Sequence, residues 1–127
     1  MAKIVICDDD PVILKAIQVT LRTSGHELHL AADGLAGLEL VERERPALVL
    51  TDVAMPGLSG LELADAIRAR PHLAHIPVLL VSASAQRAEL EEGYRHGAVG
   101  YITKPFRPAE LRAKVEQILE RGAHGLL

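Results

Sequence analysis

The stretch that decides the fold reads Lys3-Ile4-Val5-Ile6-Cys7-Asp8-Asp9-Asp10, a short apolar run that ends in three acids. Two later apolar runs also end on a charged residue: residues 47–51 lead into Asp52, and residues 99–103 lead into Lys104. In an open parallel α/β sheet, ligands bind outside the carboxyl ends of the strands. The three runs therefore predict one polar pocket of carboxylates and a single cation, which suits a divalent metal and a phosphoryl group.

Around these runs, β-like segments alternate with helical segments five times, which is the pattern of repeated βα units and a parallel sheet. Apolar residues recur at helical spacing, as at Ile13, Ile17 and Leu21. The apolar run at 77–82 is continuous, as in a strand buried on both faces, and we expect it to be the central strand. Strands are expected at 3–7, 27–31, 47–51, 77–82 and 99–103, and helices at 11–24, 35–44, 60–70, 86–96 and 108 to about 121.

Length and composition narrow the class of protein. The 127 residues, 49% of them hydrophobic, fit a single domain, which we expect at residues 1–121, with 122–127 as a tail or the start of a linker. The net charge of -3 and scattered basic residues argue against direct binding of nucleic acid. Cys7 is the only cysteine, so we expect a reducing, cytoplasmic location and a buried, unreactive thiol. Neither a signal peptide nor an apolar run of membrane-spanning length is recognisable.

Four segments together resemble the CheY-like receiver domain of two-component response regulators. They occur in the family's order and spacing and cover nearly the whole chain: residues 7–11, 51–60, 81–83 and 101–106. The resemblance implies an α/β, flavodoxin-like (βα)5 domain, with a five-stranded parallel sheet of order 2-1-3-4-5 and helices on both faces.

The resemblance also implies roles for the acids. Asp52 matches the phosphoacceptor, a carboxylate that becomes an acyl phosphate. Asp9 is expected to bind Mg²⁺ (or Mn²⁺) directly and Asp8 to bind it through water, while the backbone carbonyl of Ala54 is a further ligand. Three carboxylates in one pocket repel one another, so the cation should be required. Asp10, which a proline follows, is expected to cap a helix instead.

Three further residues match the family's switching elements. Lys104 resembles the lysine that pairs with the acids at rest and with the phosphoryl oxygen afterwards, and the bond to Pro105 is expected to be cis. Ser82 matches the hydroxyl residue that moves toward the phosphoryl group, and Tyr101 matches the aromatic residue whose ring turns inward in response. Positions 54 and 84 vary in the family, so the lifetime of the phosphoryl group is not readable.

The implied function is phosphoacceptor signalling. The chain should take a phosphoryl group from a phosphohistidine of a histidine kinase or phosphotransfer protein, and catalyse only its own phosphorylation and slow dephosphorylation. Output should pass through a surface of the helix at 86–96, the strand at 99–103 and the helix from 108. This surface should dock a downstream protein or, upon phosphorylation, a second copy of the chain. Its charged residues are mixed in sign: Arg87, Glu91, Arg95 and Arg112.

Three alternatives remain open. The chain could be a domain from a longer response regulator or hybrid histidine kinase. It could be a haloacid-dehalogenase-like phosphatase with an aspartyl nucleophile after the first strand, a pattern that residues 8–12 meet only loosely. It could also be an interaction module that never takes phosphate, although all the chemical positions are filled.

Other polar features have simpler interpretations. His72 and His75 have a spacing that could hold zinc, but no third ligand is near and we expect an ordinary loop. Gly57 and Gly60 are expected to shape the loop beside Asp52 because the P-loop ending is absent. The charged run at 89–92 is expected to be a solvated helix face.

Overall fold

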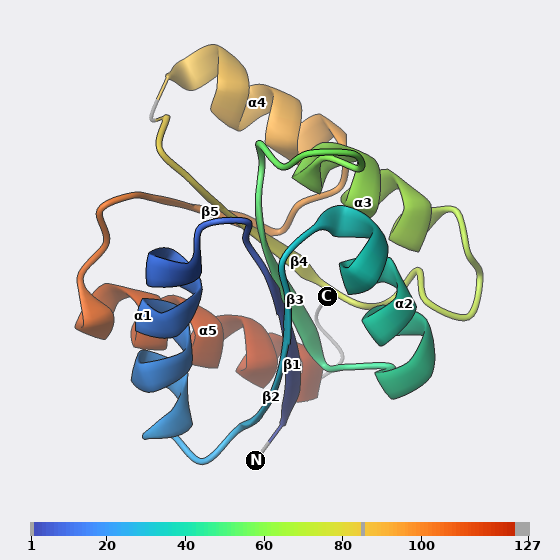
Figure 1. Cartoon of the computed structure of the whole chain (residues 1–127). Coiled ribbons are helices and arrows are strands. Elements are labelled where there is room, and N and C mark those ends of the chain that lie inside the picture. The colour runs from blue at the N-terminus through green and yellow to red at the C-terminus, as the bar shows by residue number, and fades with distance from the viewer. Residues whose placement is uncertain (1, 85, 124–127) are drawn as a thin grey trace.

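A single parallel sheet with helices on both sides forms the structure, a computed structural model that describes residues 2–84 and 86–123 (Figure 1). The strands are β1 (Lys3–Cys7), β2 (Glu27–Ala31), β3 (Leu48–Asp52), β4 (Val78–Ser82) and β5 (Gly100–Thr103). The helices are α1 (Pro11–Arg22), α2 (Gly34–Glu44), α3 (Gly60–Arg68), α4 (Arg87–Arg95) and α5 (Pro108–Ala123). The strand order is β2-β1-β3-β4-β5 and every pairing is parallel, which confirms the expected flavodoxin-like fold.

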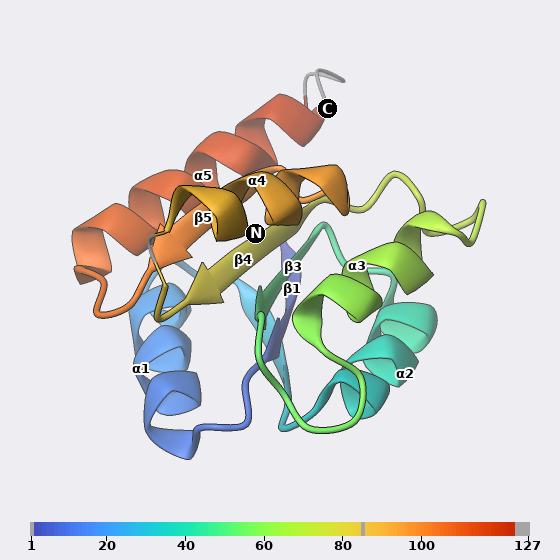
Figure 2. The same cartoon turned by 90° about the horizontal axis from the view of Figure 1, so that it is seen from above.

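Helices cover both faces of the sheet (Figure 2), and an apolar cluster lies on each side of it. Successive residues of a strand face opposite sides, so a strand covered on both sides needs apolar residues at every position. In β3, Leu48 and Leu50 belong to a cluster with residues of α1 and α5, whereas Val49 belongs to a cluster with residues of α2 and α3. This explains the continuous apolar runs in the sequence.

The helices differ in how firmly they pack. On α1, Ile17 and Leu21 are buried in the core, as their helical spacing predicted. On α4, the only residue that is fully buried is Gly93, whose missing side chain leaves room for Leu80 and Tyr101. The run at 89–92 is exposed apart from the half-buried Leu90, as expected. Consequently α4 is attached to the sheet by fewer apolar side chains than α1.

Several sequence expectations need correction. The run at 77–82 was expected to be the central strand, but β3 lies in the middle and β4 lies between β3 and β5. The expectation was wrong because β3 and β4 are equally buried, so apolar content cannot rank them. Helices α1 and α3 end two residues earlier than expected, and α5 continues through Ala123. Gly122 and Ala123 of the expected tail therefore belong to α5, and residues 124–127 lie outside the described residues.

Among the helices of the described residues, none has both the length and the apolar character needed to cross a bilayer.

Candidate functional site at the carboxyl edge of the sheet

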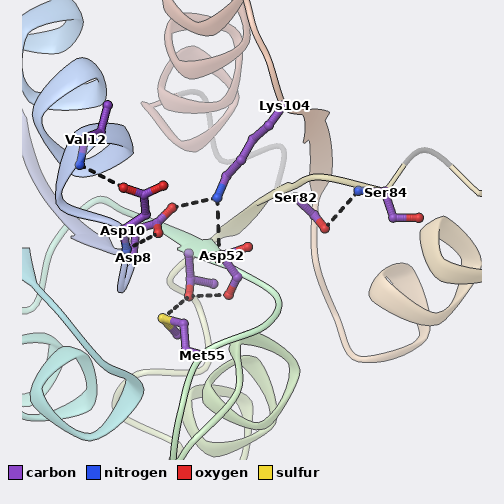
Figure 3. Close-up of polar contacts among 9 residues, drawn as sticks. Asp8, Asp10, Val12, Asp52, Met55, Ser82, Ser84 and Lys104 are labelled. Carbon is purple, nitrogen blue, oxygen red and sulfur yellow. Dashed lines mark hydrogen bonds and ion pairs between the residues drawn. The ribbon is translucent and has the colours of Figure 1, made fainter.

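Polar residues follow the ends of adjacent strands, as the sequence predicted. Asp8 directly follows β1, Asp52 is the last residue of β3, and Ser82 is the last residue of β4. Lys104 directly follows β5, and its backbone N–H donates a hydrogen bond to the Ser82 carbonyl oxygen at 2.7 Å. Because all strands are parallel, these residues meet at one edge of the sheet (Figure 3).

Lys104 joins the two buried acids. Its Nζ lies 2.9 Å from Asp8 Oδ2 and 3.5 Å from Asp52 Oδ2. The other oxygen of Asp8, Oδ1, accepts a hydrogen bond from the backbone N–H of Asp10 at 2.8 Å. Both oxygens of Asp8 therefore have a partner. Lys104 Nζ lies closer to Asp8 than to Asp52, so Asp52 is the more weakly paired of the two acids. The Lys104–Pro105 bond is cis, as the resemblance implied.

Burial sets the electrostatics of the pair. Loss of solvent raises the pKa of the Asp52 carboxyl, Lys104 opposes that shift, and the charge of Asp8 adds to it. The pKa of Lys104 is raised as well. Its burial favours the neutral amine, but the hydrogen bond to Asp8 and the charges of both acids outweigh this. One ammonium thus has to neutralise a pocket with more than one carboxylate.

Oxygen ligands for a divalent metal are already gathered in the pocket. Carboxylate oxygens of Asp8, Asp9 and Asp52 lie within 4.8 Å of one another, and Asp9 is exposed to solvent. Such a set of hard oxygen donors with an open side fits Mg²⁺, which retains several waters when it binds protein. Ala54 is exposed in the loop that follows β3, two residues beyond Asp52.

Asp10 is a helix cap, as predicted, because its Oδ1 accepts a hydrogen bond from the Val12 N–H at 2.9 Å, with proline at the first position of α1.

Two glycines shape the chain that follows Asp52, as predicted. A Cβ at Gly60 would collide with the carbonyl oxygen of Asp52, so only glycine permits this approach of α3. Gly57 has φ +75°, which also favours glycine.

Some residues that position the site were missed. The Thr51 hydroxyl donates a hydrogen bond to the carbonyl oxygen of Asp52 at 2.9 Å and contacts Met55 Sδ at 3.9 Å. Nothing in the sequence distinguishes this threonine from any other strand residue. By contrast, Ser59 and Glu62 form a capping box at the start of α3, and the Ser-x-x-Glu pattern could have revealed it.

Among the described residues, neither of the expected switch residues, Ser82 and Tyr101, forms a side-chain hydrogen bond to the acids. Ser82 Oγ accepts a hydrogen bond from the Ser84 N–H at 3.3 Å. The Tyr101 hydroxyl is buried and has no hydrogen-bond partner among the described residues. Gly93 of α4 lies against the Tyr101 ring, so this ring connects β5 to the helix that packs most lightly.

Burial disfavours a reactive form of Cys7, and His72 and His75 lie in the turns between α3 and β4, as an ordinary loop predicts. The pKa of the Cys7 thiol is raised to about 12, first by burial and then by the charges of Asp33 and Asp8, so the thiolate is disfavoured. His72 pairs with Glu42 at 2.7 Å, and within residues 2–84 and 86–123 neither His72 nor His75 belongs to a group of ligands that could hold a metal.

Comparison with known proteins agrees with this geometry. A family model described as the response regulator receiver domain matches residues 4–116. The chemotaxis protein CheY-3 of Vibrio cholerae is 38% identical over 120 residues, which cover 94% of this chain and 92% of that protein. The chain also matches DNA-binding regulators such as RpaA of Synechocystis, with 34% identity, but it spans only 50% of that protein's length.

Solved structures give the same result. The chemotaxis response regulator CheY4 of Vibrio cholerae has a TM-score of 0.88 and 30% identity, with 93% of this chain and 98% of that chain covered. The receiver domain of the sensor histidine kinase PA1611 from Pseudomonas aeruginosa has a TM-score of 0.87 and 29% identity, with 94% and 98% covered. That structure has a magnesium ion coordinated in its active-site cleft.

Proposed function

The chain belongs to the response regulator receiver family, and from that premise we propose that Asp52 accepts a phosphoryl group from a phosphohistidine on a histidine kinase or phosphotransfer protein. The observation that carries the proposal is the group of Asp8, Asp9 and Asp52 carboxylates within 4.8 Å, with Lys104 Nζ 3.5 Å from Asp52. In the transfer, an Asp52 oxygen bonds to phosphorus, the bond between phosphorus and the imidazole nitrogen breaks, and the imidazole leaves with its electron pair.

Each residue of the pocket has a part in this step. Asp52 is the nucleophile because it is the less firmly paired of the two acids that Lys104 contacts. Asp9, Asp52 and the Ala54 carbonyl would hold Mg²⁺, with Asp8 acting through water, and the ion would supply charge neutralisation for the acids and the phosphoryl oxygens. Lys104 exchanges one anionic partner for another, which its long stem and point charge permit.

Signalling follows from the residues beside the pocket. The phosphoryl group provides new acceptor oxygens, to which the Ser82 hydroxyl, now an acceptor from the Ser84 N–H, can donate its own proton. Tyr101 then stabilises a changed position of α4, whose packing against the sheet is light. The altered α4-β5-α5 face binds a downstream protein or a second copy of the chain.

The partners and setting belong to the same proposal. A histidine kinase is the partner that the receiver family implies. For this chain itself we propose a cytoplasmic location, because it has a single cysteine. Because the chain spans about half of several transcriptional regulators, a receiver within a longer regulator is the alternative form. Residues 1–121 would be the receiver in either case, with output supplied by another domain or another protein.

A haloacid-dehalogenase-like phosphatase is less well supported. Its nucleophile would follow the first strand, which places it at Asp8. That side chain is only 1% exposed, and both of its oxygens are bound by Lys104 and the Asp10 N–H. A carboxylate held in this way is poorly placed to attack a phosphate ester.

Mass spectrometry after incubation with acetyl phosphate and Mg²⁺ tests the proposal. Wild-type protein should gain one phosphoryl group, because Asp52 is the sole acceptor, and Asp52→Asn should gain none. Asp8→Asn serves as the comparison: a phosphatase with its nucleophile at Asp8 would lose its activity in that variant and retain it in Asp52→Asn. Labelling of Asp52→Asn at the wild-type level would refute the assignment.

A further inference from the structure

A second group of side chains that could bind a metal lies on the outermost strand, β2, and at the end of α2, away from the acid pocket. Glu27 and His29 are separated by one residue on β2, so their side chains share a face of this edge strand. Glu44 is the last residue of α2, the helix that packs on that face. These residues surround the beginning of β2, whereas Asp52 lies at the carboxyl end of β3.

The imidazole of His29 points between the two carboxylates. His29 Nε2 lies 2.7 Å from Glu27 Oε2 and 3.6 Å from Glu44 Oε1. In a tetrahedral site with zinc–nitrogen and zinc–oxygen bonds of about 2.1 Å, neighbouring ligand atoms are about 3.4 Å apart. The two observed separations lie on either side of that value, so small rotations of the side chains would complete the geometry.

The ligand set defines the class of metal. Imidazole nitrogen suits Zn²⁺ and the later first-row transition ions, whereas Mg²⁺ prefers oxygen ligands. The site is also partly shielded, because the side chains of His29 and Glu44 are 24% and 17% exposed. It therefore differs in chemistry from the all-oxygen pocket around Asp52.

Neighbouring cations modulate this site. Arg43 Nε donates to Glu44 Oε2 at 2.9 Å, which orients the carboxylate and leaves Oε1 toward His29. Lys3 Nζ lies 3.3 Å from that same Oε1 and competes with a metal for it. Lys3 has an exposed, flexible side chain that can move away.

We propose that Glu27, His29 and Glu44 form a binding site for a transition-metal dication of the Zn²⁺ class, with water as the fourth ligand. The ion binds His29 Nε2 and an oxygen of each carboxylate, and it links the edge strand β2 to the end of α2. The site is independent of phosphoryl transfer, since none of its ligands belongs to the acid pocket.

Calorimetric titration with Zn²⁺ in saturating Mg²⁺, which fills the acid pocket, tests the proposal. Wild-type protein should bind one Zn²⁺ and show a raised melting temperature, because a ligand that binds only the folded state stabilises it. His29→Gln should weaken binding by more than about tenfold, since loss of even an indirect partner of a metal costs that much. His72→Gln is the matched control, because His72 pairs with a single carboxylate, Glu42, at 2.7 Å.

A third variant separates metal binding from a plain ion-pair network. Lys3→Gln removes the competing ammonium and should tighten Zn²⁺ binding, whereas a network without metal would only lose an ion pair. Absence of Zn²⁺ binding by the wild type, equal losses in His29→Gln and His72→Gln, or weaker binding in Lys3→Gln would each overturn the proposal. Phosphorylation of Asp52 is measured separately and does not depend on these outcomes.

Discussion

Leu50 and Asp52 lie two residues apart on β3 and are both largely buried, but they have opposite kinds of neighbour. Leu50 belongs to the cluster of aliphatic side chains beneath α1 and α5. Asp52 faces Asp8 and shares a single ammonium with it. One strand can therefore contribute to the stability of the core at one position and lower that stability with a buried charge at another. The effect of each residue depends on the side chains that surround it.

Removal of the apolar member should have the largest effect. Leu50→Ala deletes methyl groups from a fully buried site and leaves a cavity, so it should lower the free energy of unfolding by about 2–5 kcal/mol. Urea denaturation measures the loss. Leu35→Ala is the control, because Leu35 is 62% exposed and its truncation should change stability by less than about 0.5 kcal/mol.

Replacement of Asp52 should raise the stability of the protein, whereas replacement of Leu50 lowers it. Without Mg²⁺, Asp52→Asn should raise the free energy of unfolding at pH 7 by about 0.5–2 kcal/mol, because it relieves a buried negative charge at a functional site. The folded-state pKa of Asp52 is raised, so its ionisation costs stability at any pH above that pKa. As the pH falls below the ordinary carboxyl value of about 4, the carboxyl is protonated in both states and the advantage of the variant should disappear.

Urea denaturation of the wild type and of Asp52→Asn from about pH 3, roughly one unit below the ordinary aspartate pKa, to about pH 7 checks this prediction. An advantage of Asp52→Asn that stayed constant across the range would mean that charge is not its origin. Added Mg²⁺ should reduce the advantage at pH 7, since the ion stabilises only a pocket that retains its carboxylate.

The neighbouring acids sharpen the contrast between structural and functional carboxylates. Asp10→Ala should cost about 1 kcal/mol of stability, because the cap on Val12 is lost, while Mg²⁺ affinity is retained. Asp9→Ala should leave stability nearly unchanged, since Asp9 is exposed, but weaken Mg²⁺ binding severely. Thermal melts with and without Mg²⁺ measure both quantities, and an exchange of the two results would contradict the assigned roles.

The smallest effect on stability is expected at the switch. Ser82→Ala removes a single long hydrogen bond from the Ser84 N–H and should cost less than about 1 kcal/mol. With beryllofluoride and Mg²⁺, amide signals from 82 to 114 should shift in the wild type, and those far from the pocket should shrink in the variant. Ser84→Ala should retain them. A full set of distant shifts in Ser82→Ala would show that its hydroxyl does not couple the pocket to α4.

The fold and the acid pocket could largely be predicted because their signals are local. An apolar run followed by an acid identifies both a strand and the edge at which its ligand residue lies, as for Asp8 and Asp52. Apolar content alone did not give the position of β4 in the sheet, because burial on both faces is common to all inner strands; the correct order came from the family resemblance. The contacts of Thr51 were equally hidden, since a hydroxyl that bonds the next carbonyl leaves no pattern in the sequence and the contact with Met55 depends on the path of the loop after β3.

The zinc-class site shows another limit of sequence reasoning. Its ligands are recognisable only after β2 and α2 are packed together, because Glu44 lies 15 positions after His29 and no spacing rule connects them. The histidine pair that did have a suggestive spacing, His72 and His75, belongs to no group of ligands in the described ranges 2–84 and 86–123. Spacing along the chain identifies ligands on one element better than ligands shared between two.

The ion pair between Asp8 and Lys104 joins residues that are 96 positions apart. During synthesis, Asp8 and Asp52 emerge from the ribosome long before the lysine that neutralises them. The pocket therefore cannot assemble on a nascent chain until β5 has been made and has joined the sheet. A partly synthesised or truncated chain that retained both acids would lack the cation, so only a nearly complete domain could receive a signal.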